Sequence, residues 1–199
     1  MSPGQVQEAL SRVKLLQEMV LVRRRFRGYS GPARVVGGLA ALVGALVMSS
    51  EAVPKTPLAQ LAGWGCVLAA GLLVNYGALT VWFLNDPEQR RQFIKLMPAL
   101  EIVPCLATGG ALSLAAIVHG QYQLLFGIWM AMYGLAHLFY RLSLPKTIYL
   151  LGIFYLLCGA YCLFAPGVSF TNPWPMGLTF FFGETAGGFI LYCQRLEDN

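Results

Sequence analysis

Two glutamates lie in long apolar stretches of the sequence and are its first candidates for chemistry. Glu184 stands about ten residues from either end of the apolar range 174–193, between Gly183 and Gly187. An ionisable group at the centre of a bilayer costs roughly 2.5 kcal/mol or more, so such a residue is a functional candidate by default. Because burial disfavours the charged form, we expect Glu184 to be protonated if it is unpaired.

Three other polar side chains fall at a depth similar to that of Glu184. Asn75 reaches this level in the second apolar range, and Tyr76 and Tyr133 lie close to it. The sequence therefore predicts a ligand-binding pocket formed by Glu184, Asn75, Tyr76 and Tyr133. In the alternative interpretation, Glu184 hydrogen-bonds a neighbouring helix and only stabilises packing.

A second ionisable pair lies nearer the cytoplasmic surface. Glu101 comes about one turn inside the third apolar range, between Pro98 and Pro104, and His137 is about one turn from the end of the fourth. Since the two ranges form a hairpin, we expect a Glu101–His137 pair that favours the protonated imidazole and relays protons or senses pH. The alternative is that both are interfacial residues, with Glu101 extending towards a basic loop.

The remaining candidates for chemistry are weaker. The five cysteines all fall within apolar ranges, and we interpret them as packing residues. Cys158 and Cys162 are four residues apart and share a helical face that could bind a soft metal, but the sequence offers no third ligand nearby. There is no Walker motif, HExxH motif, nucleophile elbow or Cys-His-carboxylate set. We therefore predict no catalytic residues, no metal and no cofactor.

Composition indicates what must position these residues. Of 199 residues, 57% are hydrophobic and 12% are charged, about half the charge of a typical soluble domain. Several apolar runs exceed the ~18 residues needed to cross a bilayer. The predicted fold is an all-α polytopic membrane helix bundle with six transmembrane helices, at about 33–50, 59–84, 97–118, 121–142, 146–165 and 174–193.

Basic residues indicate how this bundle is oriented. On a six-span count, all of the 14 lysines and arginines except Lys55 fall on one side, which the positive-inside rule makes cytoplasmic. Both termini are then cytoplasmic, and the membrane is the inner (plasma) membrane. The cations lie at helix ends rather than among aromatic residues on one face, so we expect no nucleic-acid partner.

Residues 1–30 form a separate unit ahead of the transmembrane domain, 31–199. Apolar residues recur at helical spacing through 2–27, with charged residues opposite, and predict an amphipathic helix on the cytoplasmic membrane surface or against a partner. The helix ends in a basic cluster suited to anionic headgroups, formed by Arg23, Arg24, Arg25 and Arg27.

An internal repeat links the apolar ranges. The motifs Tyr76-Gly77, Tyr133-Gly134 and Phe182-Gly183 align in the three even-numbered ranges, which predicts a transmembrane hairpin repeated three times. With the stretches 126–134, 151–154 and 164–166, these aromatic-glycine patterns make the last half of the chain resemble the HdeD-like family of six-span bacterial membrane proteins. The resemblance implies a stress-associated membrane protein without a defined catalytic site, and no functional residues to carry over.

The leading functional prediction is a non-enzymatic inner-membrane protein that binds or moves a small or amphiphilic ligand, which is a small molecule or lipid. One alternative is an accessory or structural subunit, in which the small residues Gly37, Ala41 and Ala45 serve a homo-oligomer or another membrane subunit instead of internal packing. Another is an intramembrane enzyme that uses Glu101 and Glu184 as acid and base. A substrate-capture component of a vitamin transporter would also match the size and topology.

Overall fold

The computed structural model describes residues 7–8, 10–14, 30–85, 102–139 and 147–197, and their regular structure is entirely helical. Each of the six predicted apolar ranges contains an α-helix, so the all-α prediction is confirmed for these residues. The helices are α2 (Gly31–Ser49), α3 (Pro57–Asn85), α6 (Val103–Val118), the short 3-10 helix η2 (Tyr122–Leu124), α7 (Leu125–Phe139), α8 (Ile148–Phe164) and α9 (Trp174–Glu197).

Three of the helices are long and apolar enough to cross a membrane, judged by length and composition. These are α2, α3 and the part of α9 from Trp174 to Gln194. Two shorter helices, α6 and α8, are also apolar. The composition therefore suggests that the chain associates with a membrane.

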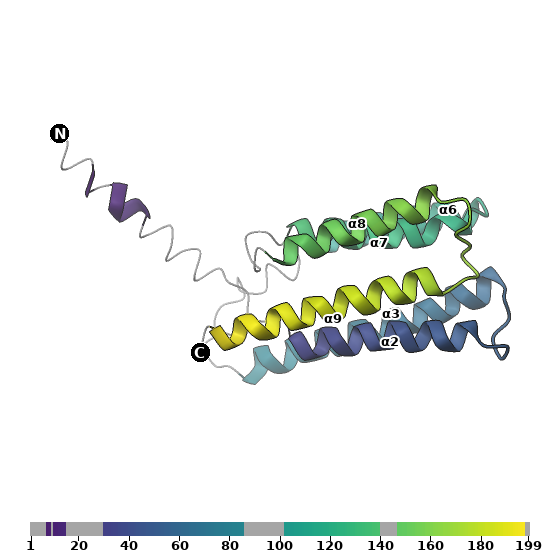
Figure 1. The fold of residues 1–199 in the computed structure, drawn as a ribbon, viewed down its shortest axis with the longest axis horizontal. Coiled ribbons are helices and arrows are strands. Elements are labelled where there is room, and N and C mark those ends of the chain that lie inside the picture. Colours follow the sequence, from purple (N-terminus) through teal and green to yellow (C-terminus); the bar gives the residue numbers. More distant parts are fainter. Residues whose placement is uncertain (1–6, 9, 15–29, 86–101, 140–146, 198–199) are drawn as a thin grey trace.

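The helices form two groups of three (Figure 1). In one group α2 packs against both α3 and α9, and in the other α7 packs against both α6 and α8. The most extensive contacts are those of α2 with α9 and of α7 with α8. The hairpin repeat predicts that α2 pairs with α3, α6 with α7, and α8 with α9. The first two pairs are in contact as predicted, whereas α8 and α9 contact each other less.

Small residues allow α2 and α9 to approach closely. A Cβ at Gly31 would meet the backbone of Gly188, and one at Gly177 would overlap Ala45. Ala41 and Ala45 are buried, so this part of the predicted small-residue stripe serves internal packing. Gly37 instead lies beside the Asn75 side chain of α3.

Glycines at a spacing of seven residues bring α7 and α8 together. A Cβ at Gly134 would come within 2.8 Å of the Gly152 carbonyl oxygen, and one at Gly159 within 3.0 Å of the Gly127 carbonyl oxygen. Since 7 residues are close to two helical turns, Gly127 and Gly134 lie on one face of α7, and Gly152 and Gly159 lie on one face of α8. Side chains at these positions would separate the two backbones.

An aromatic cluster joins the two helical groups near the loops 50–56, 119–124 and 165–173. Phe126 of α7 contacts Trp64 of α3 edge-on, with ring centroids 5.8 Å apart, and Phe170 of the α8–α9 loop at 4.9 Å. All three side chains belong to one buried core that also includes Met48 and Met176. The core therefore spans both groups.

The N-terminal region is described only at 7–8 and 10–14, which are helical and exposed. Glu8 and Arg12 form an ion pair there at 2.7 Å, one turn apart. The remainder of the predicted amphipathic helix, including the basic cluster of Arg23, Arg24, Arg25 and Arg27, lies outside the described residues.

The packing of α7 on α8 generates a prediction. Gly159→Leu should lower the free energy of unfolding by about 1–3 kcal/mol or more, because the new side chain meets the backbone of α7. Gly110→Leu on α6 is the matched control, since a Cβ there meets nothing within 4 Å. Thermal unfolding of the purified proteins in detergent measures both, and equal effects would contradict the packing described.

Candidate functional site

A buried ion pair between α2 and α9 is the centre of the candidate site. Arg34 Nε donates to Glu184 Oε2 at 2.9 Å, and Arg34 Nη2 donates to Oε1 at 2.8 Å. The two parallel bonds form the fork that a guanidinium and a carboxylate make together. Both side chains are at most 8% exposed, so two opposite charges neutralise each other in apolar surroundings.

Two tyrosines complete the hydrogen bonding of the carboxylate. Tyr133 of α7 donates its hydroxyl to Glu184 Oε1 at 2.8 Å, and Tyr155 of α8 donates to the same oxygen at 2.9 Å. Glu184 thus accepts four hydrogen bonds and donates none, as an ionised carboxylate does. A ligand for Glu184 would have to displace one of these donors.

His137 connects the guanidinium to α7. Its Nε2 lies 2.8 Å from Arg34 Nη2, and its Nδ1 lies 2.8 Å from the backbone oxygen of Tyr133. An arginine nitrogen can only donate and a carbonyl oxygen can only accept. The partners therefore assign the proton to Nδ1 and a lone pair to Nε2, which is the neutral imidazole. We name these five residues, Arg34, Tyr133, His137, Tyr155 and Glu184, the polar network.

Two glycines of α9 make room for the polar network. A Cβ at Gly183 would overlap the Tyr155 ring, and one at Gly187 would come within 2.8 Å of Arg34 Cζ. They are one residue before and three residues after Glu184, so they flank it on the same side of the helix. The sequence Gly183-Glu184-Thr185-Ala186-Gly187 therefore positions the acid and admits its partners.

The beginning of α2 places Arg34 in an unfavourable field that Glu184 offsets. Ser30 caps the helix, and its hydroxyl accepts a hydrogen bond from the Ala33 amide at 3.4 Å. Arg34 therefore lies in the first turn, where the helix dipole is positive and disfavours a cation. The ion pair with Glu184 offsets this unfavourable position.

The structure brings together only some of the predicted site residues. Tyr133 contacts Glu184, as the predicted pocket requires. Asn75 donates its amide to Gly71 O of its own helix at 2.9 Å, and Tyr76 is 39% exposed. His137 lies in the polar network with Arg34 and Tyr133, while its predicted partner Glu101 lies outside the described residues.

Two members of the polar network were not predicted. Charge counting places Arg34 among the cytoplasmic cations without a partner; in the structure it is buried and pairs with Glu184, so that carboxylate is not unpaired. One signal was available, because Arg34 shares a helical face with Gly38, Ala41 and Ala45. Tyr155 likewise lies on the face of α8 that carries Gly152 and Gly159.

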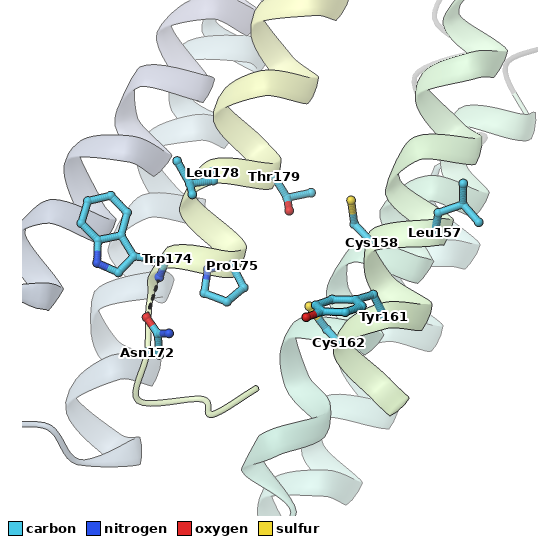
Figure 2. Close-up of a pocket in the computed structure, with 9 residues that line it drawn as sticks. All are labelled: Leu157, Cys158, Tyr161, Cys162, Asn172, Trp174, Pro175, Leu178 and Thr179. Carbon is cyan, nitrogen blue, oxygen red and sulfur yellow. Dashed lines mark hydrogen bonds between the residues drawn. The ribbon is translucent and has the colours of Figure 1, made fainter. Parts of the chain in front are cut away.

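A cleft opens between α8 and α9 (Figure 2). It has a volume of about 530 Å³, within the usual range for small-molecule sites. Near it Asn172 Oδ1 accepts a hydrogen bond from the Trp174 amide at 3.3 Å and leads into α9. The lining is mostly apolar and consists of Leu157, Cys158, Tyr161 and Cys162 of α8 and Asn172, Trp174, Pro175, Leu178 and Thr179 of α9 and its approach.

Comparisons with family models, curated proteins and solved structures found no match for this chain. The resemblance to HdeD-like proteins stays a prediction.

Breaking the ion pair from one side should be costly. Arg34→Met or Glu184→Met should each lower the free energy of unfolding by about 3–5 kcal/mol, because the remaining charge is buried without its partner. The double variant should cost less than the two single variants combined, since it leaves neither charge. Unfolding in mixed detergent measures all three.

The exposed Glu8–Arg12 pair supplies the control for this comparison. Both side chains are more than 60% exposed, so Glu8→Gln should leave unfolding unchanged. Additive effects of the two substitutions at positions 34 and 184 would contradict the buried ion pair.

Proposed function

We propose that this chain is a six-span inner-membrane protein, with both termini cytoplasmic, that binds an amphiphilic ligand in the α8–α9 cleft. The helices alternate in direction, so the loops 50–56, 119–124 and 165–173 share one end of the bundle. Their only charged residues are Glu51 and Lys55, whereas the segments that join the helices at the other end, 86–101 and 140–146, carry five lysines and arginines. This asymmetry supports the proposed orientation.

The observation that carries the proposed function is the cleft itself. Its lining combines apolar side chains with a few polar groups, the composition typical of sites that bind small apolar molecules. Asn172 and Trp174 stand where α9 begins, at the end of the bundle with few charges. An amphiphile fits this arrangement with its head group near these two residues and its tail beside Leu157 and Leu178.

The polar network bounds the cleft on one side, where it joins α8 to α9. Tyr155 of α8 bonds Glu184 of α9, and the Tyr155 ring also lies 5.1 Å from that of Phe180. The cleft residues Cys158 and Thr179 come next along each helix, towards the loop 165–173. Glu184 thereby acts on the ligand through the position of α8, and needs no contact with it.

Narrowing the cleft tests this proposal. Thr179→Phe should weaken binding of a fluorescent single-chain lipid by about tenfold, equivalent to 1.4 kcal/mol, because the ring occupies the space of the tail. Native mass spectrometry should show the corresponding loss of co-purifying lipid. Leu150→Phe is the control, since Leu150 is 61% exposed on α8, two turns from Leu157 and outside the cleft. Equal binding by the two variants would refute a ligand site in the cleft.

A second candidate, an accessory subunit, is favoured by the exposure of α3. Only 6% of the most apolar window of α3 is buried, against 39% for α2. In this case a second membrane protein covers the face that carries Leu73, which is 75% exposed. Leu73→Trp should then remove a stoichiometric partner from the mildly extracted complex, whereas Leu157→Trp should retain it. Extraction of the wild-type chain without a partner would exclude this role.

A further inference from the structure

His137 is the member of the polar network whose side-chain type titrates near neutral pH. It is 3% exposed, and its two ring nitrogens each lie 2.8 Å from a partner, Nε2 from Arg34 Nη2 and Nδ1 from the Tyr133 carbonyl oxygen. The contact with Arg34 requires a lone pair on Nε2, because a guanidinium nitrogen can only donate. We propose that His137 is a proton-binding site, and that acid breaks its contact with Arg34 and loosens α2 from α7.

The groups around His137 decide what a proton does there. The charged and titratable side chains of the described residues that face it are Arg34 of α2, Tyr133 of α7 itself, Tyr155 of α8 and Glu184 of α9. The helix α6 also packs against α7, and Cys105, a thiol that is neutral near pH 7, is the titratable side chain that it carries between Val103 and Val118. With a neutral imidazole, one cation and one carboxylate therefore balance each other in the polar network.

Protonation of His137 disturbs this balance in two ways. Nε2 becomes a donor, so it and Arg34 Nη2 face each other as two donors where a hydrogen bond now lies. The polar network also gains a net positive charge, which is costly in apolar surroundings. The Nδ1 bond to the Tyr133 carbonyl oxygen is possible in both protonation states and holds the ring in place. The proton therefore acts against Arg34, which only Glu184 then retains in the network.

The location of His137 suits exchange of protons with one side of a membrane. His137 is in the last turn of α7 and Arg34 is in the first turn of α2, so both lie at the end of the bundle where the charged segments 86–101 and 140–146 join the helices. The orientation in the proposed function makes this end cytoplasmic, and on that basis the site responds to cytoplasmic pH. The response itself depends neither on the orientation nor on a ligand.

Unfolding of the detergent-purified protein between about pH 7.5 and 5.5 tests the site, a range in which histidine titrates and most carboxylates do not. In the unfolded chain His137 takes up a proton freely, whereas Arg34 opposes it in the folded protein. The unfolding equilibrium constant of the wild type should therefore rise as the pH falls, by up to about tenfold for each pH unit below about 6.5. His137→Gln should remove this dependence, because the amide oxygen can accept from Arg34 and does not titrate.

The matched control is His119→Gln, which replaces the other of the two histidines, an exposed residue at the end of α6, and should retain the acid effect. In this variant the NMR signals of the histidine ring nitrogens come from His137 alone. At neutral pH they should show the proton on Nδ1 and the lone pair on Nε2, and acid should convert the ring to imidazolium as the protein loses stability.

Four results would overturn the proposal. They are an acid effect that is absent from the wild type, one that persists in His137→Gln and so belongs to another group, one that is lost in His119→Gln, and a ring that carries its proton on Nε2 at neutral pH. The NMR measurement keeps His137 in place, so it decides the matter even if His137→Gln does not fold. Neither measurement needs an added lipid, so failure here is distinguishable from failure of the amphiphile proposal.

Discussion

The ion pair of Arg34 and Glu184 is the interaction on which the arrangement of the helices depends. Neither charge can remain buried without the other, so the packing of α2 on α9 requires that the two meet. The carboxylate then accepts hydrogen bonds from Tyr133 of α7 and Tyr155 of α8. A single side chain of α9 is thereby bonded to three other helices. Gly183 and Gly187, next to Glu184, leave room for its partners. The polar contacts and the close packing of the helix backbones therefore both depend on glycines in the sequence.

The helices could be predicted from the sequence because the signal for them is local. An apolar run of sufficient length is visible within one segment, and each predicted range contains a helix. Glu184 was identified in the same way, as an acid within an apolar run. Its partners could not be identified so easily, because pairing depends on contacts between residues far apart in the chain. Arg34 stands 150 positions from Glu184, and counting charges placed it only among the cytoplasmic cations.

Tyr155 is a second buried polar residue whose role could not be predicted from its residue type. The α8 tyrosines Tyr149, Tyr155 and Tyr161 all stand among apolar residues, and their types do not distinguish them. In the structure Tyr155 is fully buried, whereas Tyr149 and Tyr161 are 39% and 67% exposed. The difference follows from helical phase, since Tyr155 is three residues after Gly152 and four before Gly159, on the face that packs. The spacing of glycines is therefore more informative about a buried polar residue than the residue itself.

The polar network and the cleft use the same two helices, and this connects them energetically. Tyr155 and Cys158 are one turn apart on α8, and Thr179 and Glu184 are five residues apart on α9. The Tyr155–Glu184 hydrogen bond requires a certain spacing between α8 and α9. A ligand that holds the two helices at this spacing must bind more tightly when the hydrogen bond is present. The coupling is reciprocal, so the ligand then stabilises the ion pair by the same free energy. A ligand that forces the helices apart couples with the opposite sign. The buried charges, whose geometry is fixed by four helices, would thus respond to a ligand bound in the cleft as proposed.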